Sequence, residues 1–333
     1  MRMTALGRRG VPASQLGVGL AAVARPGYIT LGRAYDLPAE RTPEALFTRT
    51  AAILDAARDA GVRYVDVARS YGRAEEFLAR WLRERALPAG ALTVGSKWGY
   101  RYTAGWQIEA RVHEEKELSL ARFTAQLAES VALLGDRLAL YQIHSATTES
   151  GCLADLPLLR ALVAARRSGA YRAVGLTLTG PDSRRTLDLA LAARVDGEPV
   201  FDVVQATFNI LEPSLRDSLA VARNAGMGVI LKEVHANGRL TPANQRPADE
   251  PLRRRLEQIA GRHDLATDQL AIAFAAAHGS ADVVLSGAAT QAQLASHAAA
   301  LDVALDAPAL AELAALAEPP AAYWQNRSAL PWT

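Results

Sequence analysis

Short apolar runs recur along the whole chain and are separated by longer amphipathic segments. The runs are rich in Val, Ile, Leu and Tyr. They are apolar throughout rather than alternating, which is typical of strands buried on both faces of a parallel sheet. We expect eight such strands, near residues 15–20, 62–67, 92–97, 138–144, 171–176, 200–207, 227–232 and 282–286.

The segments between these runs carry apolar residues at three- and four-residue spacing, the pattern of helices that bury one face. The segment 43–60 is a clear example, and it ends at Gly61, a helix-stop residue. Further helices are expected at 74–86, 119–134, 154–168, 182–194, 213–225, 250–262, 267–277, 291–301 and 307–317.

This alternation predicts an α/β fold, a (β/α)8 TIM barrel. Residues 3–14 are expected to form a β-hairpin that caps the barrel floor, and extra C-terminal helices follow the last strand. No Pro/Ser-rich linker divides the chain, so we predict a single barrel domain over residues 1–333. Residues 319–333, PPAAYWQNRSALPWT, are expected to form an aromatic, non-helical C-terminal tail.

The composition indicates which binding partners and which cellular location to expect for the protein. The net charge of 333 residues is only +2, so we expect no nucleic-acid partner. Cys152 is the only cysteine, so no intrachain disulfide can form. The stretch LGVGLAAVA after Arg8-Arg9 is short and broken by glycines, and no run reaches the roughly 18 apolar residues of a membrane span. We therefore expect a soluble, cytoplasmic protein without a membrane partner.

Four residues with useful chemistry, Asp66, Tyr71, Lys97 and His144, lie at or just past the ends of predicted strands. In a parallel barrel such strand ends converge at one mouth. Tyr71 could protonate a carbonyl oxygen while another group supplies hydride, and Lys97 would lower the pKa of that phenol from its usual value near 10. Asp66 would pair with Lys97, and His144 would donate a hydrogen bond to the carbonyl.

The segment 98–118 is too long for a minimal connection between a strand and a helix, and it is rich in aromatic residues. Long βα loops at the C-terminal face of a barrel commonly shape substrate sites. We therefore expect Trp98, Tyr100 and Trp106 to line a substrate pocket. Their rings could stack on the apolar face of a sugar or on a hydrophobic carbonyl compound.

Other chemistries are less well supported. The six histidines are scattered without a metal-ligand pattern, so no metal is expected. Gly17, Gly19 and Ala22 spell a dinucleotide fingerprint, but no convincing strand precedes it. A barrel lyase that uses Lys97 as a Schiff-base amine stays open, and it predicts trapping by borohydride without nicotinamide dependence.

In combination, the motifs resemble the aldo-keto reductase superfamily from about residue 14 to residue 302. VDVARSYGRAEEFL is similar to the family segment with an aspartate and a tyrosine five residues apart. SKWG matches the family lysine, and LYQIHS matches the histidine. The resemblance implies a nicotinamide cofactor bound in extended form without a Rossmann domain, and hydride delivery to an aldehyde or ketone. It leaves open a regulatory subunit that binds the cofactor with little turnover.

The resemblance also implies cofactor contacts. Gln205 in VVQATFNILE matches the glutamine that contacts the nicotinamide amide, and the usual Ser-Asn pair appears as Thr177-Leu178 in VGLTLTG. Lys232 stands near the point where an aromatic ring commonly stacks on the nicotinamide. LSGAATQAQLASH resembles the segment that binds the adenosine phosphate, and its expected contacts are Ser286, Gly287, Thr290 and Gln293.

Cofactor selectivity is left open by the sequence. NADPH-selective members often carry Lys or Arg near Ala289 and Gln293, and their absence removes cations that would hold a 2′-phosphate. His297 stands where an asparagine is frequent. The cofactor is therefore expected to be NADP(H) or NAD(H). KEVHANGRL and the aromatic tail are similar to a branch with aldose 1-dehydrogenase-like members, which implies oxidation of a sugar hemiacetal as an alternative.

Overall fold

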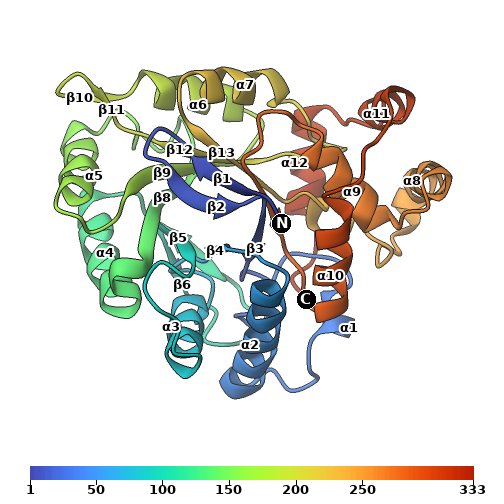
Figure 1. The fold of residues 1–333 in the computed structure, drawn as a ribbon, viewed down its shortest axis with the longest axis horizontal. Coiled ribbons are helices and arrows are strands. Elements are labelled where there is room, and N and C mark those ends of the chain that lie inside the picture. Colours follow the sequence, from blue (N-terminus) through green and yellow to red (C-terminus); the bar gives the residue numbers. More distant parts are fainter.

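Eight parallel strands close into a barrel in the computed structural model, which describes residues 1–333. Their order around the barrel is β3-β4-β5-β8-β9-β12-β13-β14, so each strand pairs with its neighbour in the βα sequence (Figure 1). The strands are β3 (Leu16–Gly19), β4 (Tyr64–Asp66), β5 (Thr93–Trp98), β8 (Leu138–Ala146), β9 (Ala173–Leu178), β12 (Val203–Thr207), β13 (Gly228–Lys232) and β14 (Val283–Ser286). The predicted barrel and its eight strands are confirmed.

Helices surround the barrel and cover the outer face of its strands (Figure 1). Several begin at the residue that local chemistry favours: the side chains of Thr42, Ser119, Asp155 and Asp306 each accept a hydrogen bond from a first-turn amide. The helices that follow strands are α2 (Pro43–Asp59), α3 (Ala74–Glu84), α4 (Leu120–Leu134), α5 (Leu156–Arg167), α6 (Ser183–Ala192), α7 (Arg216–Asn224), α8 (Glu250–Arg262), α9 (Thr267–Ala276), α10 (Gln291–Ala300) and α11 (Ala307–Ala314).

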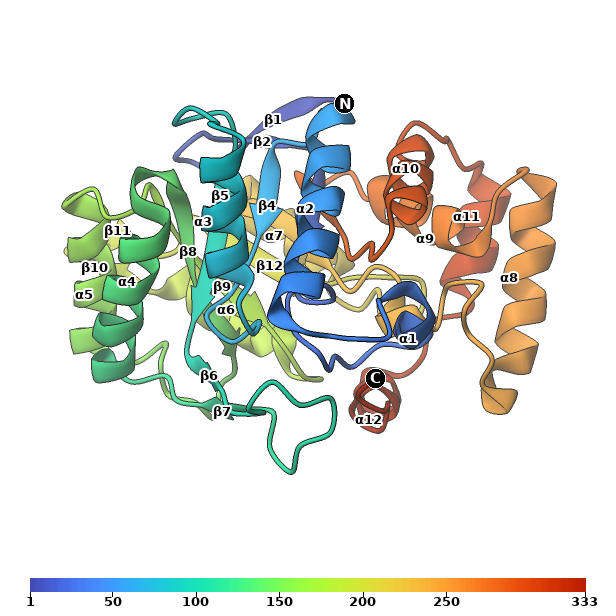
Figure 2. The ribbon, with the colours of Figure 1, turned by 90° about the horizontal axis from the view of Figure 1, so that it is seen from below.

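The N-terminal hairpin of β1 (Met3–Leu6) and β2 (Val11–Ser14) closes one end of the barrel, as predicted (Figure 2). Leu6, Val11 and Ala13 of this hairpin belong to a cluster of 11 buried residues that fills the barrel interior. Tyr64 is the large side chain of the cluster. A Cβ atom at Gly17 would lie 2.7 Å from its ring, so this strand needs a glycine to pass the tyrosine.

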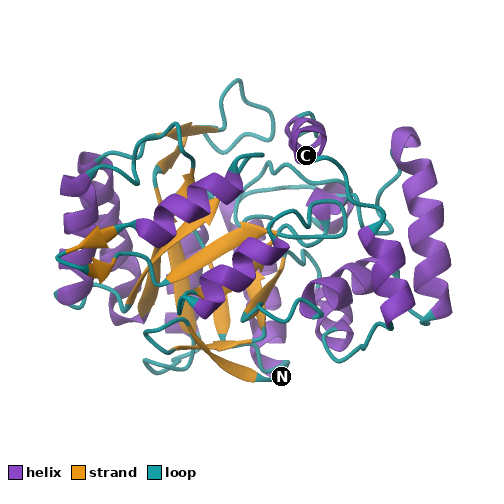
Figure 3. Ribbon diagram, turned by 90° about the horizontal axis from the view of Figure 1, so that it is seen from above, coloured by secondary structure: helices purple, strands orange, loops and turns teal.

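The other end of the barrel is covered by segments that are far apart in the sequence. The hairpin of β6 (Tyr100–Tyr102) and β7 (Glu114–Lys116), the short helix α1 (Arg33–Asp36) and the C-terminal helix α12 (Pro320–Ser328) all lie there (Figures 2 and 3). The prediction that the tail is non-helical is wrong. Pro320 starts α12 at the helix position where proline is favoured, because its missing N–H needs no partner there.

Smaller elements complete the chain. A two-residue hairpin pairs β10 (Arg194–Val195) with β11 (Glu198–Pro199), and single 3-10 turns cover Gly135–Arg137, Ala236–Gly238 and Pro247–Asp249. No helix is both long enough and apolar enough to span a bilayer.

Candidate active site

The four residues predicted to carry the chemistry come together at the end of the barrel opposite the N-terminal hairpin. Asp66 is the last residue of β4, Lys97 lies in β5, His144 lies in β8, and Tyr71 lies in the loop between β4 and α3. Because the strands are parallel, their carboxyl ends share one rim, and residues distant in sequence meet there.

Asp66 and Lys97 form the buried base of the site. Lys97 Nζ donates to Asp66 Oδ1 and, at 2.9 Å, to the carbonyl oxygen of Val67. Asp66 Oδ2 accepts hydrogen bonds from Gln205 Nε2 at 2.8 Å and from Tyr64 Oη at 3.3 Å. Both carboxylate oxygens are thus occupied, which offsets the unfavourable burial of two charges. The predicted pairing of Asp66 with Lys97 is confirmed.

Tyr71 and His144 face each other above this pair. Tyr71 Oη lies 3.4 Å from His144 Nε2, and Lys97 Nζ lies 4.7 Å from the centre of the Tyr71 ring. His144 Nδ1 is buried and has no hydrogen-bond partner. If the proton is on Nε2, the unpaired Nδ1 is an acceptor, and no buried N–H group is left without a partner. In this tautomer Nε2 can donate a hydrogen bond to a substrate oxygen.

The pKa values of both groups are displaced in the direction that keeps them neutral. Burial raises the pKa of Tyr71 well above its usual value, and the Asp66 carboxylate raises it further. Burial lowers the pKa of His144 well below its usual value, with Lys97 and Lys232 adding to the effect. The main cation that lowers the pKa of Tyr71 is Arg25, not Lys97 as expected.

A cavity of about 520 Å³ opens above Tyr71 and His144 and extends across the rim to the end of β14. This volume is within the usual range for sites that bind small molecules or cofactors. Tyr100 lines the cavity, and its ring centre lies 4.9 Å from that of His144. Trp98 does not line it: the side chain is fully buried and packs against Phe123 of α4. Trp106 also lies outside it and donates its Nε1 hydrogen to the carbonyl oxygen of Arg41.

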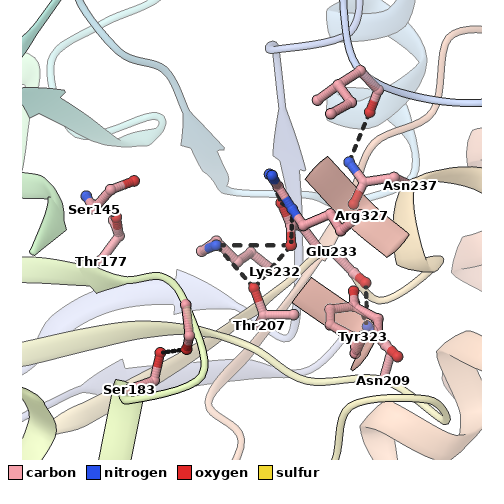
Figure 4. Close-up of polar contacts among 12 residues, drawn as sticks. Ser145, Thr177, Ser183, Thr207, Asn209, Lys232, Glu233, Asn237, Tyr323 and Arg327 are labelled. Carbon is pink, nitrogen blue, oxygen red and sulfur yellow. Dashed lines mark hydrogen bonds and ion pairs between the residues drawn. The ribbon is translucent and has the colours of Figure 1, made fainter. Parts of the chain in front are cut away.

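Most of the residues predicted to bind a cofactor line this cavity. Thr177 Oγ1 accepts from the amide of Ser145 at 2.7 Å, and Lys232 Nζ donates to Thr207 Oγ1 at 2.9 Å (Figure 4). The residues of the predicted set that line the cavity are Thr177, Gln205, Lys232, Ser286, Gly287 and Gln293. Thr290 is the exception, because it is the N-cap of α10 and its side chain bonds to the Gln293 amide.

The structure adds charged residues that the sequence did not single out. Arg327 of α12 donates through Nε to both carboxylate oxygens of Glu233, at 3.0 and 3.1 Å, beside Lys232 (Figure 4). Arg25 donates to Glu114 at 2.6 Å, and its guanidinium lies over the Tyr71 ring. The partners in these pairs are separated by 94 and 89 residues, so no local pattern could have indicated them.

The C-terminal residues form part of the cavity wall. Trp332 lines the cavity, pairs with Ile29 in an antiparallel bridge and stacks on His113, with ring centres 3.9 Å apart. The Thr333 amide donates to the Tyr28 carbonyl oxygen at 3.0 Å. The tail is therefore fixed against the segment that follows β3.

Comparison with known proteins decides the family. The model of the Aldo/keto reductase family matches residues 37–318, which is most of the chain. This protein belongs to the aldo/keto reductase family. It is accordingly an NAD(P)-dependent oxidoreductase that acts on a small carbonyl compound.

Solved structures agree on the fold. This aldo-keto reductase is similar to aldo-keto reductase AKR11C1 from Bacillus halodurans (holo form), with a TM-score of 0.73, 19% identity, and 96% and 97% of the two chains covered. A crystal structure of a putative aldo-keto reductase from Pseudomonas aeruginosa gives a TM-score of 0.64 and 20% identity, with 90% and 93% covered. No curated protein sequence matches the chain.

The cavity of this aldo-keto reductase fits a nicotinamide dinucleotide. It is a single space that connects the Tyr71–His144 pair with the start of α10, and it carries polar side chains at both ends. A Cβ atom at Gly287 would meet no atom within 4 Å, so no neighbouring group covers the backbone of the cavity wall at this residue.

The pH profile of the enzyme should reflect Lys232 rather than Tyr71 or His144. Burial lowers the pKa of Lys232 to about 8, whereas those of Tyr71 and His144 lie beyond the neutral range on either side. We expect kcat/KM for carbonyl reduction to fall as the pH rises through about 8, because a neutral Lys232 loses the charged donor that would hold the nicotinamide end of the cofactor. The Lys232→Met enzyme should give a flat profile there. A decrease of the same size in this variant would assign the titration to another group.

Proposed function

We propose that the chain interconverts a small polar aldehyde or ketone and its alcohol, with Tyr71 as the general acid and base. The observation that carries the proposal is the convergence of Tyr71 Oη and His144 Nε2, 3.4 Å apart, at the end of the cavity above the Asp66–Lys97 pair. One carbonyl oxygen can accept hydrogen bonds from both groups at once.

The bound nicotinamide supplies or accepts the hydride in this reaction. Tyr71 donates its proton to the carbonyl oxygen in reduction and accepts the alcohol proton in oxidation. His144 holds the carbonyl oxygen and favours the charge that develops on it. Gln205 and Lys232 would hold the nicotinamide end, while Ser286, Gly287 and Gln293 would hold the adenosine end.

The cavity walls near Tyr71 support a polar substrate. Tyr100 and Trp332 offer aromatic faces, while Glu114 and Glu233 offer carboxylate acceptors that are paired with Arg25 and Arg327. Aromatic faces beside charged hydrogen-bonding groups suit a sugar, which has apolar ring faces and polar edges. The oxidation of a sugar hemiacetal is therefore included in the proposal.

The Schiff-base alternative finds no support in the geometry. Lys97 is fully buried, does not line the cavity and is held by Asp66 and a backbone carbonyl. A substrate carbonyl would have to displace this ion pair to reach Nζ.

Absorbance of the reduced nicotinamide tests the proposal directly. NADH and NADPH are each paired with a panel of aldehydes and ketones, and the oxidised forms are paired with aldoses. Turnover that is lost in Tyr71→Phe supports the proposal. Cofactor binding without turnover would favour a regulatory subunit, and covalent trapping by borohydride without a nicotinamide would favour the lyase.

A further inference from the structure

The end of the cavity farthest from Tyr71 presents a carboxylate. Asp36, the last residue of α1, lines the cavity, and its Oδ2 accepts from Gln293 Nε2 at 2.9 Å. Asp36 lies on the segment between β3 and α2, while Gln293 lies in the first turn of α10, 257 residues away. Asp36 forms no ion pair, so its charge faces the cavity without a cation beside it.

The Gln293 side chain occupies part of the start of α10. Gln293 Oε1 accepts from the amides of Ala289 and Thr290, at 2.8 and 3.3 Å, and Thr290 Oγ1 accepts from the Gln293 amide at 3.1 Å. The Gln293 side chain is therefore fixed at both ends, by its own helix and by Asp36. A phosphate would have to break these bonds to use the amides of Ala289, Thr290 or Gln293.

The other polar groups at this end are already engaged. Arg33 is buried, and its guanidinium donates to the backbone carbonyls of Ala22, Arg25, Pro26 and Thr333. His297 lies between Ser286 Oγ, at 2.8 Å from Nδ1, and Asp268 Oδ2, at 3.4 Å from Nε2. The Arg33 guanidinium is thus held by backbone carbonyls.

We infer that Asp36, held in place by Gln293, accepts hydrogen bonds from the ribose hydroxyls of the adenosine and selects NAD(H) over NADP(H). The inference rests on the proposed function, because it places the adenosine at this end of the cavity. A carboxylate is a good acceptor for a ribose 2′-hydroxyl, and the same charge repels a 2′-phosphate. Asp36 is thus a specificity-determining residue for the cofactor.

Equilibrium binding tests this without any turnover. The purified protein is titrated with NADH and NADPH, and separately with the fragments 5′-AMP and adenosine 2′,5′-bisphosphate, by calorimetry. We expect the wild-type protein to bind NADH and 5′-AMP at least about tenfold more tightly than their 2′-phosphorylated counterparts, an effect of the size of one charge-assisted hydrogen bond. Tighter or equal binding of NADPH would overturn the inference.

Variants isolate the role of Asp36. Asp36→Ser should reduce the preference for NADH by roughly tenfold, and the double change Asp36→Ser with Gln293→Arg should reverse it, since an arginine fork suits a phosphate. Glu40→Ser, an exposed acid on the same segment that does not line the cavity, is the matched control and should leave the ratio unchanged. An unchanged ratio in Asp36→Ser, in protein with an unaltered melting temperature, would contradict the inference.

The outcomes for the two proposals can be separated. If neither dinucleotide binds, both the proposed function and this inference fail. If both bind but no carbonyl compound or aldose is turned over, the proposed chemistry fails, while the affinity ratio still decides the role of Asp36.

Discussion

The Tyr71→Phe enzyme should lose carbonyl reduction by about 10²- to 10⁴-fold in kcat, the contribution typical of a positioned general acid. The change removes only the hydroxyl group, whose hydrogen-bond contact is His144 Nε2 at 3.4 Å. The ring remains, with its contacts to the Arg25 guanidinium and the Lys97 ammonium. The affinity for the cofactor should therefore stay nearly the same, and the loss should appear in kcat rather than in cofactor binding.

Tyr141→Phe is a suitable control for this experiment. Tyr141 lies in β8 and is fully buried, but it does not line the cavity, and its hydroxyl contacts Ser130 Oγ at 3.2 Å. This variant loses the same hydroxyl group away from the chemistry and should keep its activity. Single-turnover measurements with saturating reduced cofactor separate the chemical step from product release. Equal single-turnover rates in Tyr71→Phe and the wild-type protein would remove Tyr71 from its assigned role.

Breaking the ion pair between Arg327 and Glu233 should destabilise the protein. Only 9% of the Glu233 side chain is exposed, and Arg327 Nε donates to both of its oxygens, so Arg327→Met leaves a largely buried carboxylate with only Lys232, 4.0 Å away, and Thr207 (Figure 4). Removing one partner of a fully buried pair typically destabilises a protein by about 3–5 kcal/mol, and we expect a smaller loss here because 25% of the Arg327 side chain is exposed. Because Arg327 is in the last helix, part of this effect should appear as local release of α12. Urea unfolding measures the global loss, and hydrogen exchange of residues 320–333 measures the local release.

The effect of Arg327→Met should depend on pH with a definite sign. Arg327 and Lys232 lower the pKa of Glu233 to about 2, so the stability from this pair is fully present above the usual glutamate value and is lost as the pH falls toward 2. The difference in unfolding free energy between wild type and variant should shrink on acidification. Arg254→Met removes an exposed arginine from an i,i+4 pair on α8 and should change stability little. A pH-independent difference, or an equal effect of both substitutions, would contradict the role of the buried pair.

The helices and strands could be predicted from the sequence because buried positions recur at regular spacing along each of them. A strand covered on both faces must be apolar throughout, and a helix packed on a barrel must be apolar on one stripe, so both patterns are visible locally. The helix in the tail has a local signal, because Pro319-Pro320 is a pair that can start a helix. Trp98 could have been placed correctly as well. Successive side chains of a strand point to opposite faces, so if Lys97 points inward, Trp98 must point outward toward the helices.

The walls of the cavity were beyond the sequence for a physical reason. Arg25 with Glu114, Glu233 with Arg327, and Asp36 with Gln293 are contacts between residues separated by 89, 94 and 257 positions. Each contact depends on how a loop or terminal helix folds over the rim. The hydrophobic periodicity of the sequence does not predict the course of these segments. The pKa of Tyr71 could not be predicted from the sequence either, because it depends on burial and on several charges that folding brings together.

The sequence by itself therefore determined the barrel, the family resemblance and the four residues that meet at its mouth. Those features follow from local burial patterns and from short motifs attached to strand ends, and the parallel closure of the barrel then brings the strand ends together. Only the tertiary structure decided which aromatic rings line the cavity, that the C-terminal helix closes over it, and that a carboxylate stands at its far end. These depend on contacts between distant segments, whose energies arise only once the chain has folded.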